Sequence, residues 1–177
     1  VGVTMHILMC NDDGILADGL RRLASYLSQY YRITVVAPAN EQSAKSHALT
    51  TEIPLKLDAY NGEDENPRLY ALTGTPSDCM KFGLSYLLSD DMPDLVISGI
   101  NHGFNLGSDV LYSGTVSAAM ESCFYGIPGL ALSVERYSPE RGDEMHPFIH
   151  ELIEKIYVKG NFDGLLNVNF PLRGVCD

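Results

Sequence analysis

The chain lacks the features that mark membrane-spanning, exported and zinc-binding proteins. It has no apolar run close to the roughly 20 residues of a membrane-spanning helix, and its start shows no basic segment followed by a long apolar stretch. Its four cysteines form neither a C-x-x-C pair nor a Cys/His spacing typical of zinc: Cys10, Cys79, Cys123 and Cys176. We therefore expect reduced thiols, a cytoplasmic location and no membrane partner.

Positive charge is also scarce. The chain has 12 Lys and Arg residues against 23 Asp and Glu residues, which gives a net charge of −11. Such a surface repels a nucleic-acid backbone, so we expect no groove for a nucleic-acid polymer. It repels a small anionic substrate as well. If the substrate carries phosphate, a bound cation or backbone N–H groups must supply the local attraction.

The length and composition are those of a single globular domain. The chain has 177 residues, of which 45% are apolar and 20% are charged, and we assign residues 1–177 to one domain. Short apolar runs predict strands at Met5–Cys10, Ile33–Ala37, Ile53–Leu57, Leu69–Leu72, Leu95–Ser98, Leu130–Val134 and Leu165–Asn169. Helical spacing or composition predicts helices at Leu16–Tyr30, Ser77–Ser89, Val116–Tyr125 and Pro147–Val158. The polar stretch Glu135–Met145 is expected to be a mobile loop.

This alternation of strands and helices predicts an α/β fold, with a mostly parallel sheet and helices on both faces. In open sheets of this kind, ligands bind beyond the carboxyl ends of the strands. The residues that follow each strand are therefore the candidates for a functional site.

The first such segment is Asn11-Asp12-Asp13-Gly14. Two adjacent carboxylates directly after a buried strand are costly unless they are paired or bind a cation. Gly14 lets the backbone bend, so that both side chains can turn toward one point. The alternative is a turn followed by a helix N-cap, because Asp favours both positions.

Three further polar segments follow predicted strands or precede a helix. The loop 38–47 offers several oxygen donors, including Ser43, although it also fits an ordinary surface loop. The segment 98–107 contains three glycines but no G-x-G-x-x-G, so it indicates either close backbone approach to a ligand or a flexible loop. The segment 112–115 precedes a helix, whose start favours an anion or is simply capped by Ser or Thr.

Together these segments predict a site of carboxylates, neutral oxygen donors and an anion-binding helix start at one edge of the sheet. Oxygen donors without Cys or His favour one divalent ion, Mg²⁺ or Mn²⁺. Such an ion polarises a phosphoryl oxygen and lowers the pKa of a bound water. The pattern therefore favours phosphate chemistry.

Six segments in this order resemble the stationary-phase survival protein SurE family. They are Asn11-Asp12-Asp13-Gly14, Glu41-Gln42-Ser43, Gly74-Thr75-Pro76-Ser77-Asp78-Cys79, Ser98-Gly99-Ile100-Asn101-His102-Gly103, Tyr112-Ser113-Gly114-Thr115-Val116 and Asn167-Val168-Asn169-Phe170-Pro171. The resemblance implies a Rossmann-like sheet and a metal-dependent phosphatase. Its expected substrates are nucleoside 5′- and 3′-monophosphates, and short polyphosphate in some members.

The resemblance also implies roles for individual residues. The implied metal ligands are Asp12, Asp13, Ser43 and Asn101, and the implied phosphate contacts are Ser113, Gly114 and Thr115, with Asn105 nearby. The family has a C-terminal segment that exchanges between subunits, so a homodimer or homotetramer is implied. We interpret that segment as missing or disordered here, since the sequence stops at Asp177.

One loop departs from the family pattern. The family's run after the loop serine is commonly Ser-Gly-Ala-Gly-His, whereas this chain has Ser43-Ala44-Lys45-Ser46-His47. Ala44 and Lys45 are expected to stiffen or reshape the loop.

The expected mechanism is in-line attack on phosphorus by a metal-bound water, which Asp12 or Asp13 orients or deprotonates. The hydroxyls of Ser113 and Thr115 and nearby backbone N–H groups would stabilise the phosphoryl oxygens. His47 and His102 are candidates for the proton donor to the leaving oxygen, or else loop histidines that contact the backbone.

Two other classes of protein fit the sequence less well, and a third stays open. A haloacid-dehalogenase-type phosphatase needs D-x-D after its first strand, which this chain does not have. A phospho-receiver-like module needs an Asp after the middle strand, where this chain has Ser98-Gly99-Ile100-Asn101. A non-catalytic nucleotide-binding module is the third class.

Overall fold

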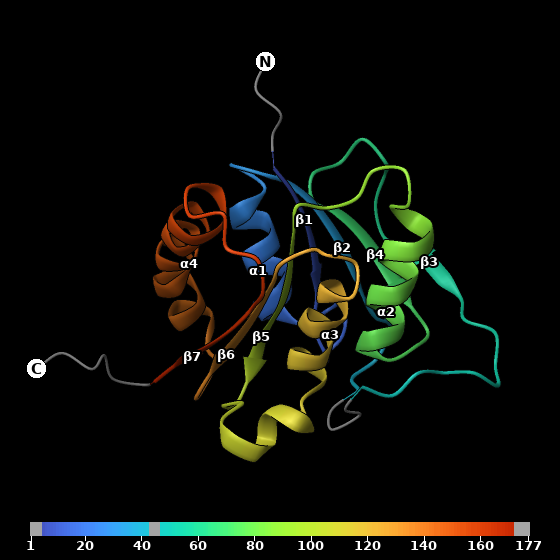
Figure 1. Cartoon of the computed structure of the whole chain (residues 1–177). Helices are drawn as coiled ribbons and strands as arrows, with labels where there is room; N and C mark the ends of the chain where they lie inside the picture. Colours follow the sequence, from blue (N-terminus) through green and yellow to red (C-terminus); the bar gives the residue numbers. More distant parts are fainter. Residues whose placement is uncertain (1–4, 43–46, 172–177) are drawn as a thin grey trace, which may run out of the picture.

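The structure is a computed structural model that describes residues 5–42 and 47–171. Its centre is a seven-stranded sheet in the order β3-β4-β2-β1-β5-β6-β7 (Figure 1). The strands are β1 (His6–Cys10), β2 (Arg32–Pro38), β3 (Leu57–Ala59), β4 (Arg68–Leu72), β5 (Leu95–His102), β6 (Gly129–Val134) and β7 (Leu165–Phe170). All neighbouring strands are parallel except β3, which pairs antiparallel with β4 at one edge.

Helices cover both faces of this sheet. The α-helices are α1 (Asp18–Leu27), α2 (Pro76–Phe82), α3 (Gly114–Cys123) and α4 (Pro139–Ile153). Shorter helical segments are η1 (Gly83–Leu87), η2 (Gly107–Leu111) and η3 (Glu154–Val158). Helices α1 and α4 lie on one face, and α2 and α3 lie on the other (Figure 1). The predicted α/β class, with a mostly parallel sheet between two helical layers, is confirmed.

The central strand β1 is buried on both faces. Ile7 and Met9 pack into the cluster beneath α1 and α4, whereas Leu8 and Cys10 pack into the cluster beneath α2. This alternation follows from the two-residue period of a strand. It explains why β1 appears in the sequence as a continuous apolar run.

The strand order has a switch point between β1 and β5. From β1 the chain moves outward to β2 and β4, and it then returns through α2 to β5 and continues to β6 and β7. Cys10 of β1 lies beside Ser98 of β5 in the parallel register. Ligands in open α/β sheets bind beyond the carboxyl ends of the strands at such a point. Asp12 lies in the loop that follows β1, and Asn101 lies at the end of β5.

Two predictions of secondary structure are wrong. Glu135–Met145 is not a loop throughout, because α4 begins at Pro139 and the side chain of Ser138 caps it by accepting from the N–H of Arg141. The predicted strand Ile53–Leu57 is also displaced, since the residues that pair with β4 are Leu57–Ala59. In both places a short polar or exposed stretch gave a periodicity too weak to define the element.

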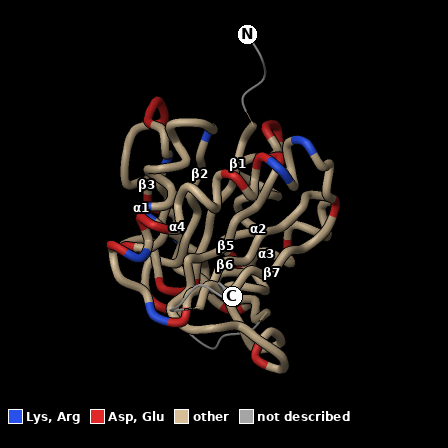
Figure 2. Tube along the Cα trace, turned by 90° about the vertical axis from the view of Figure 1, so that its left-hand side faces the viewer, with Lys and Arg blue, Asp and Glu red and all other residues tan. Residues whose placement is uncertain are grey.

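The described surface carries more acidic than basic segments. Figure 2 shows more acidic than basic stretches along the trace. Within residues 5–42 and 47–171, no helix is both long and apolar enough to span a membrane.

His6, at the start of β1, provides a test of this packing. Its side chain is buried, and Nε2 lies 2.9 Å from Thr34 Oγ1. Burial, together with the positive charge of Arg32, lowers the pKa of His6 from 6.5 to about 4. The folded protein therefore resists a protonation that the unfolded chain accepts.

We predict that the free energy of unfolding falls as the pH falls from 6.5 toward 4. Across this interval, protonation of His6 in the unfolded chain lowers the free energy of unfolding by up to about 3 kcal/mol. Urea unfolding at several pH values measures this free energy. The His6→Gln variant should show a flatter dependence of the free energy of unfolding on pH between 6.5 and 4. An equally steep profile in the variant would show that His6 is not the group responsible.

Candidate functional site

A closed turn follows β1 and presents the two aspartates. The amide of buried Asn11 binds Gly14 twice: its Oδ1 accepts from the Gly14 N–H, and its Nδ2 donates to the Gly14 carbonyl, both at 3.1 Å. Gly14 has a φ of +100°, which side chains rarely adopt. The turn is therefore fixed by the Asn11 amide and the Gly14 backbone, with Asp12 and Asp13 between them.

Asp12 contacts the start of helix α3. Its carboxylate is buried, with 6% exposed, and Oδ1 accepts a hydrogen bond of 2.7 Å from the hydroxyl of Thr115. A Cβ on Gly114 would lie 3.1 Å from the Asp12 Cβ, so this position favours glycine for the close approach. The first strand and α3, about 100 residues apart in the chain, thus meet at one carboxylate.

Neither aspartate has a Lys or Arg partner among the described residues. Burial raises the pKa of Asp12, and the hydrogen bond from Thr115 partly opposes this rise. Burial and the neighbouring charge of Asp12 raise the pKa of Asp13 to about 6. Among residues 5–42 and 47–171, no Lys or Arg forms an ion pair with either carboxylate. A bound cation would offset this cost.

Asn101 comes to the same edge from the end of β5. The pairing of β5 with β6 shifts register between Ser98 and Asn101, where Gly99 has a φ of +126°. The Asn101 Nδ2 donates to the Gly103 carbonyl at 2.9 Å. This bond orients the amide and leaves its Oδ1 as the atom available to a cation.

A cavity of about 320 Å³ brings together half of the predicted site residues. Its lining residues are Asp12, Asn101, His102, Phe104, Asn105, Asp109, Tyr112 and Ser113. Asp13, Gly114 and Thr115 do not line it, but Thr115 and Gly114 adjoin Asp12 from α3. The predicted ligand Ser43 lies outside the described residues.

The start of α3 has one of the two roles that the sequence left open, since it is capped. Ser113 caps the helix, because its side chain accepts from the N–H of Val116 at 3.1 Å. The hydroxyl of Thr115 donates to Asp12, so its hydrogen is already used. The cap bond of Ser113 uses a lone pair and not the hydroxyl hydrogen, which can still donate to an anion. The backbone N–H groups at the helix start are further candidates for binding an anion.

Asn105 is held in the cavity by the last strand. Its Nδ2 donates to Ser133 Oγ, and its backbone N–H donates to Asn169 Oδ1, both at 2.8 Å. Its carbonyl accepts from Asn167 Nδ2 at 2.8 Å. Sequence reasoning did not find these supporting roles of Ser133, Asn167 and Asn169. The available signal was the spacing of Asn167 and Asn169, which puts both on one face of β7.

The two candidate histidines differ in position. His47 Nε2 lies 2.5 Å from Glu121 Oε2, and the His47 ring packs near Phe124. This ion-pair geometry ties His47 to α3, a role that the sequence did not predict. His102 instead lines the cavity with Asp12, and its charge acts on Asp13.

The chemistry of the donors fits a hard cation. No group of three or more His, Cys, Asp and Glu side chains in the described part of the chain could hold a metal. The available donors are two carboxylates and the neutral amide oxygen of Asn101, a set that suits Mg²⁺ or Mn²⁺ and not zinc.

The sheet order and this edge define a Rossmann-like α/β protein whose candidate site joins a carboxylate pair to a helix start. A family model described as survival protein SurE matches residues 7–176. The chain belongs to this family, so the resemblance seen in the sequence is confirmed.

Individual relatives agree with this assignment. The chain is 49% identical over 168 residues to a protein of Thermoanaerobacter sp. (strain X514) named 5′-nucleotidase SurE, covering 94% of this chain and 66% of that one. It is 47% identical over 171 residues to a protein of the same name from Crocosphaera subtropica, covering 95% and 62%.

A solved structure also matches. The crystal structure of the SurE protein from Aquifex aeolicus superposes with a TM-score of 0.78 at 37% identity, covering 94% of this chain and 66% of that one. The chain therefore spans slightly less than two thirds of the length of this structure and of both curated relatives.

The bend before Asn101 depends on Gly99, and this dependence can be tested. A Cβ at Gly99 would overlap the carbonyl oxygen of Leu132 in the neighbouring strand, in addition to the cost of its positive φ. We predict that Gly99→Ala lowers the free energy of unfolding by about 3 kcal/mol or more. Chemical denaturation followed by circular dichroism measures this loss.

Gly103 is the matched control. Its φ of +112° is similar, but no atom of the described structure lies within 4 Å of a Cβ added there. Gly103→Ala should lower the free energy of unfolding by only about 1–2 kcal/mol, the cost of placing a side chain at a positive φ. Equal losses in the two variants would refute the proposed contact with Leu132.

Proposed function

We propose that this protein is a metal-dependent phosphatase that hydrolyses nucleoside 5′-monophosphates to nucleoside and phosphate. The observation that carries the proposal is the contact between Asp12 and Thr115, which joins a carboxylate pair to the start of α3 at one cavity. One end of the cavity thus suits a cation and the adjoining helix start suits an anion. The name 5′-nucleotidase SurE of two relatives supports the choice of substrate.

The cation would be held by Asp12, Asp13 and the Oδ1 of Asn101, with Ser43 as a further proposed ligand. When bound, Mg²⁺ or Mn²⁺ supplies charge compensation for the phosphoryl oxygens and a more acidic water. The hydrogen bond from Thr115 fixes the orientation of Asp12. Asp12 or Asp13 orients the attacking water or accepts its proton.

The substrate phosphate would lie at the start of α3. The N–H of Gly114, the helix dipole and the hydroxyl hydrogen of Ser113 attract its oxygens, whereas the Thr115 hydroxyl donates to Asp12. The Nδ2 of Asn105 carries a second hydrogen beyond the one donated to Ser133, and it would bind the same group. His102, on the cavity wall, would give a proton to the leaving oxygen.

Finer features of the proposal come from the family resemblance. They are activity toward nucleoside 3′-monophosphates and short polyphosphate, a cytoplasmic location, and assembly as a homodimer or homotetramer. A non-catalytic nucleotide-binding module is the alternative, and it would bind nucleotide tightly without releasing phosphate.

We predict that Asp12→Asn lowers phosphate release from adenosine 5′-monophosphate at least about a hundredfold. Removal of divalent ions with a chelator should abolish release by the unmodified protein, and added Mg²⁺ or Mn²⁺ should restore it. A colorimetric phosphate assay measures both effects.

Asp58→Asn is the control, since Asp58 lies on the edge strand β3 and pairs with Lys56. It should keep the original rate. Full phosphate release by Asp12→Asn would exclude the proposed site. Binding of the nucleotide without release by the unmodified protein would select the non-catalytic alternative.

A further inference from the structure

The cavity continues beyond the groups that phosphate chemistry needs. Phe104, Asp109 and Tyr112 line it together with Asp12, Asn101 and Ser113. None of these three has a role in holding a cation or phosphate in the proposed function. They form the nucleoside wall, as we call these three residues, and its chemistry is aromatic and acidic.

The nucleoside wall is joined to the start of α3 by the backbone. Asp109 belongs to η2, and its carbonyl accepts from the N–H of Tyr112 at 3.0 Å. The next residue, Ser113, caps α3. Tyr112 is therefore one residue from the anion-binding helix start, and a ligand held there by its phosphate has its remaining atoms near the Tyr112 ring.

The side chains of the wall have unused binding capacity. Tyr112 is 66% exposed although it lines the cavity, so its ring offers an open face. Within residues 5–42 and 47–171, Asp109 forms no ion pair with Lys or Arg. A carboxylate beside a phosphate site repels phosphate, but it accepts hydrogen bonds from two hydroxyl groups.

We infer that the nucleoside wall binds the ribose and base of the substrate: Tyr112 stacks on the base, and the Asp109 carboxylate accepts from the ribose hydroxyls. This inference rests on the proposed nucleotidase function and extends it to the neutral part of the substrate. Stacking on one aromatic face tolerates every base. The wall would thus bind nucleosides as a class without selecting among bases.

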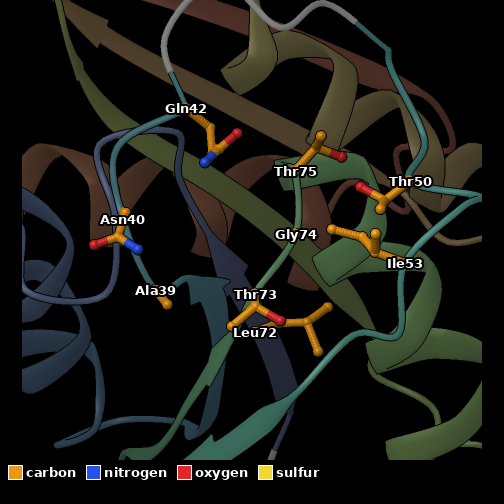
Figure 3. A pocket seen from close by; sticks show the side chains of 9 residues that line it. All are labelled: Ala39, Asn40, Gln42, Thr50, Ile53, Leu72, Thr73, Gly74 and Thr75. Atoms are coloured by element: carbon orange, nitrogen blue, oxygen red, sulfur yellow. The ribbon is translucent and has the colours of Figure 1, made fainter.

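A second cavity is the rival place for the base. Figure 3 shows it at the ends of β2 and β4, with the amides of Asn40 and Gln42 and the hydroxyl of Thr75 around it. Its volume is about 290 Å³, and it adjoins the aspartate turn because the Gln42 N–H donates to the Asp12 carbonyl at 2.7 Å. Among residues 5–42 and 47–171, its lining residues include no aromatic one, and none of them lines the cavity of Asp12 and Asn101. The Tyr112 cavity is therefore favoured.

The test of stacking compares two substrates that differ by the base. Tyr112→Ala should raise the KM for adenosine 5′-monophosphate about tenfold, since stacking on an aromatic ring is worth this much per base. The KM for ribose 5-phosphate and the kcat for both substrates should stay within about twofold. Tyr112→Phe should retain the original KM, because it keeps the ring.

Tyr86→Ala is the matched control, since Tyr86 is a similarly exposed tyrosine on η1, at 74%. It should leave the kinetics of both substrates unchanged. An equal rise in KM for ribose 5-phosphate in Tyr112→Ala would indicate a merely structural role and overturn the inference. A KM for the nucleotide that responds to Gln42→Ala and not to Tyr112→Ala would place the base in the rival cavity.

The role of Asp109 is tested with a substrate that lacks the ribose hydroxyls. Asp109→Ala should raise the KM for adenosine 5′-monophosphate and leave that for its 2′,3′-dideoxy analogue unchanged. Equal effects on both substrates would overturn this role.

If the unmodified protein releases no phosphate from any substrate, the proposed function fails. Calorimetric binding of adenosine 5′-monophosphate and ribose 5-phosphate to the unmodified protein and to Tyr112→Ala then still decides the inference. Loss of affinity for the nucleotide alone supports it, and absence of nucleotide binding or unchanged affinity overturns it.

Discussion

Two adjacent carboxylates at the end of a fully buried strand set the main constraint on this structure. Asp12 and Asp13 follow β1, which is covered on both faces, so water cannot solvate their charges fully. The hydroxyl of Thr115 stabilises the Asp12 carboxylate but brings no positive charge. No described Lys or Arg pairs with either carboxylate, so a bound cation, as proposed above, would offset the charge of the pair.

The rest of the fold serves to assemble a site around this pair. The switch point between β1 and β5 opens space beyond the two strands, and the return of the chain through α3 brings a helix start into that space. Small residues allow the approach: Gly114 lets α3 come close to Asp12, and Gly99 lets β5 bend before Asn101. The asparagines of β7 then hold Asn105 from the far side. The site is thus built from four strands and one helix.

The sequence predicted the layers of the fold better than the partners within the site. The apolar pattern located β1 and β5 as continuous runs, because strands buried on both faces leave such runs, and it located α1 by helical spacing. It missed the beginning of α4, where the signal was a capping serine followed by proline, Ser138-Pro139, inside a polar stretch. It could not pair Thr115 with Asp12 or His47 with Glu121, since these contacts join residues 103 and 74 positions apart. Such partners are set by the packing of elements, which composition does not encode locally.

The negative charge of the protein explains why separate groups in the cavity would bind the phosphate and the base. A surface with a net charge of −11 repels a nucleotide at long range, so affinity must come from short-range groups inside the cavity. In the proposed function, backbone N–H groups at α3 would act on the phosphate without adding a mobile charge. The ring of Tyr112 would act on the neutral base, where the surface charge has little effect. One continuous segment, from Asn101 to Thr115, carries groups of both kinds together with two of the proposed catalytic-site side chains, His102 and Asn105. In the proposed function, a change in the conformation of this segment would therefore alter phosphate and nucleoside binding together, so the hydrogen bonds from β7 to Asn105 would support both.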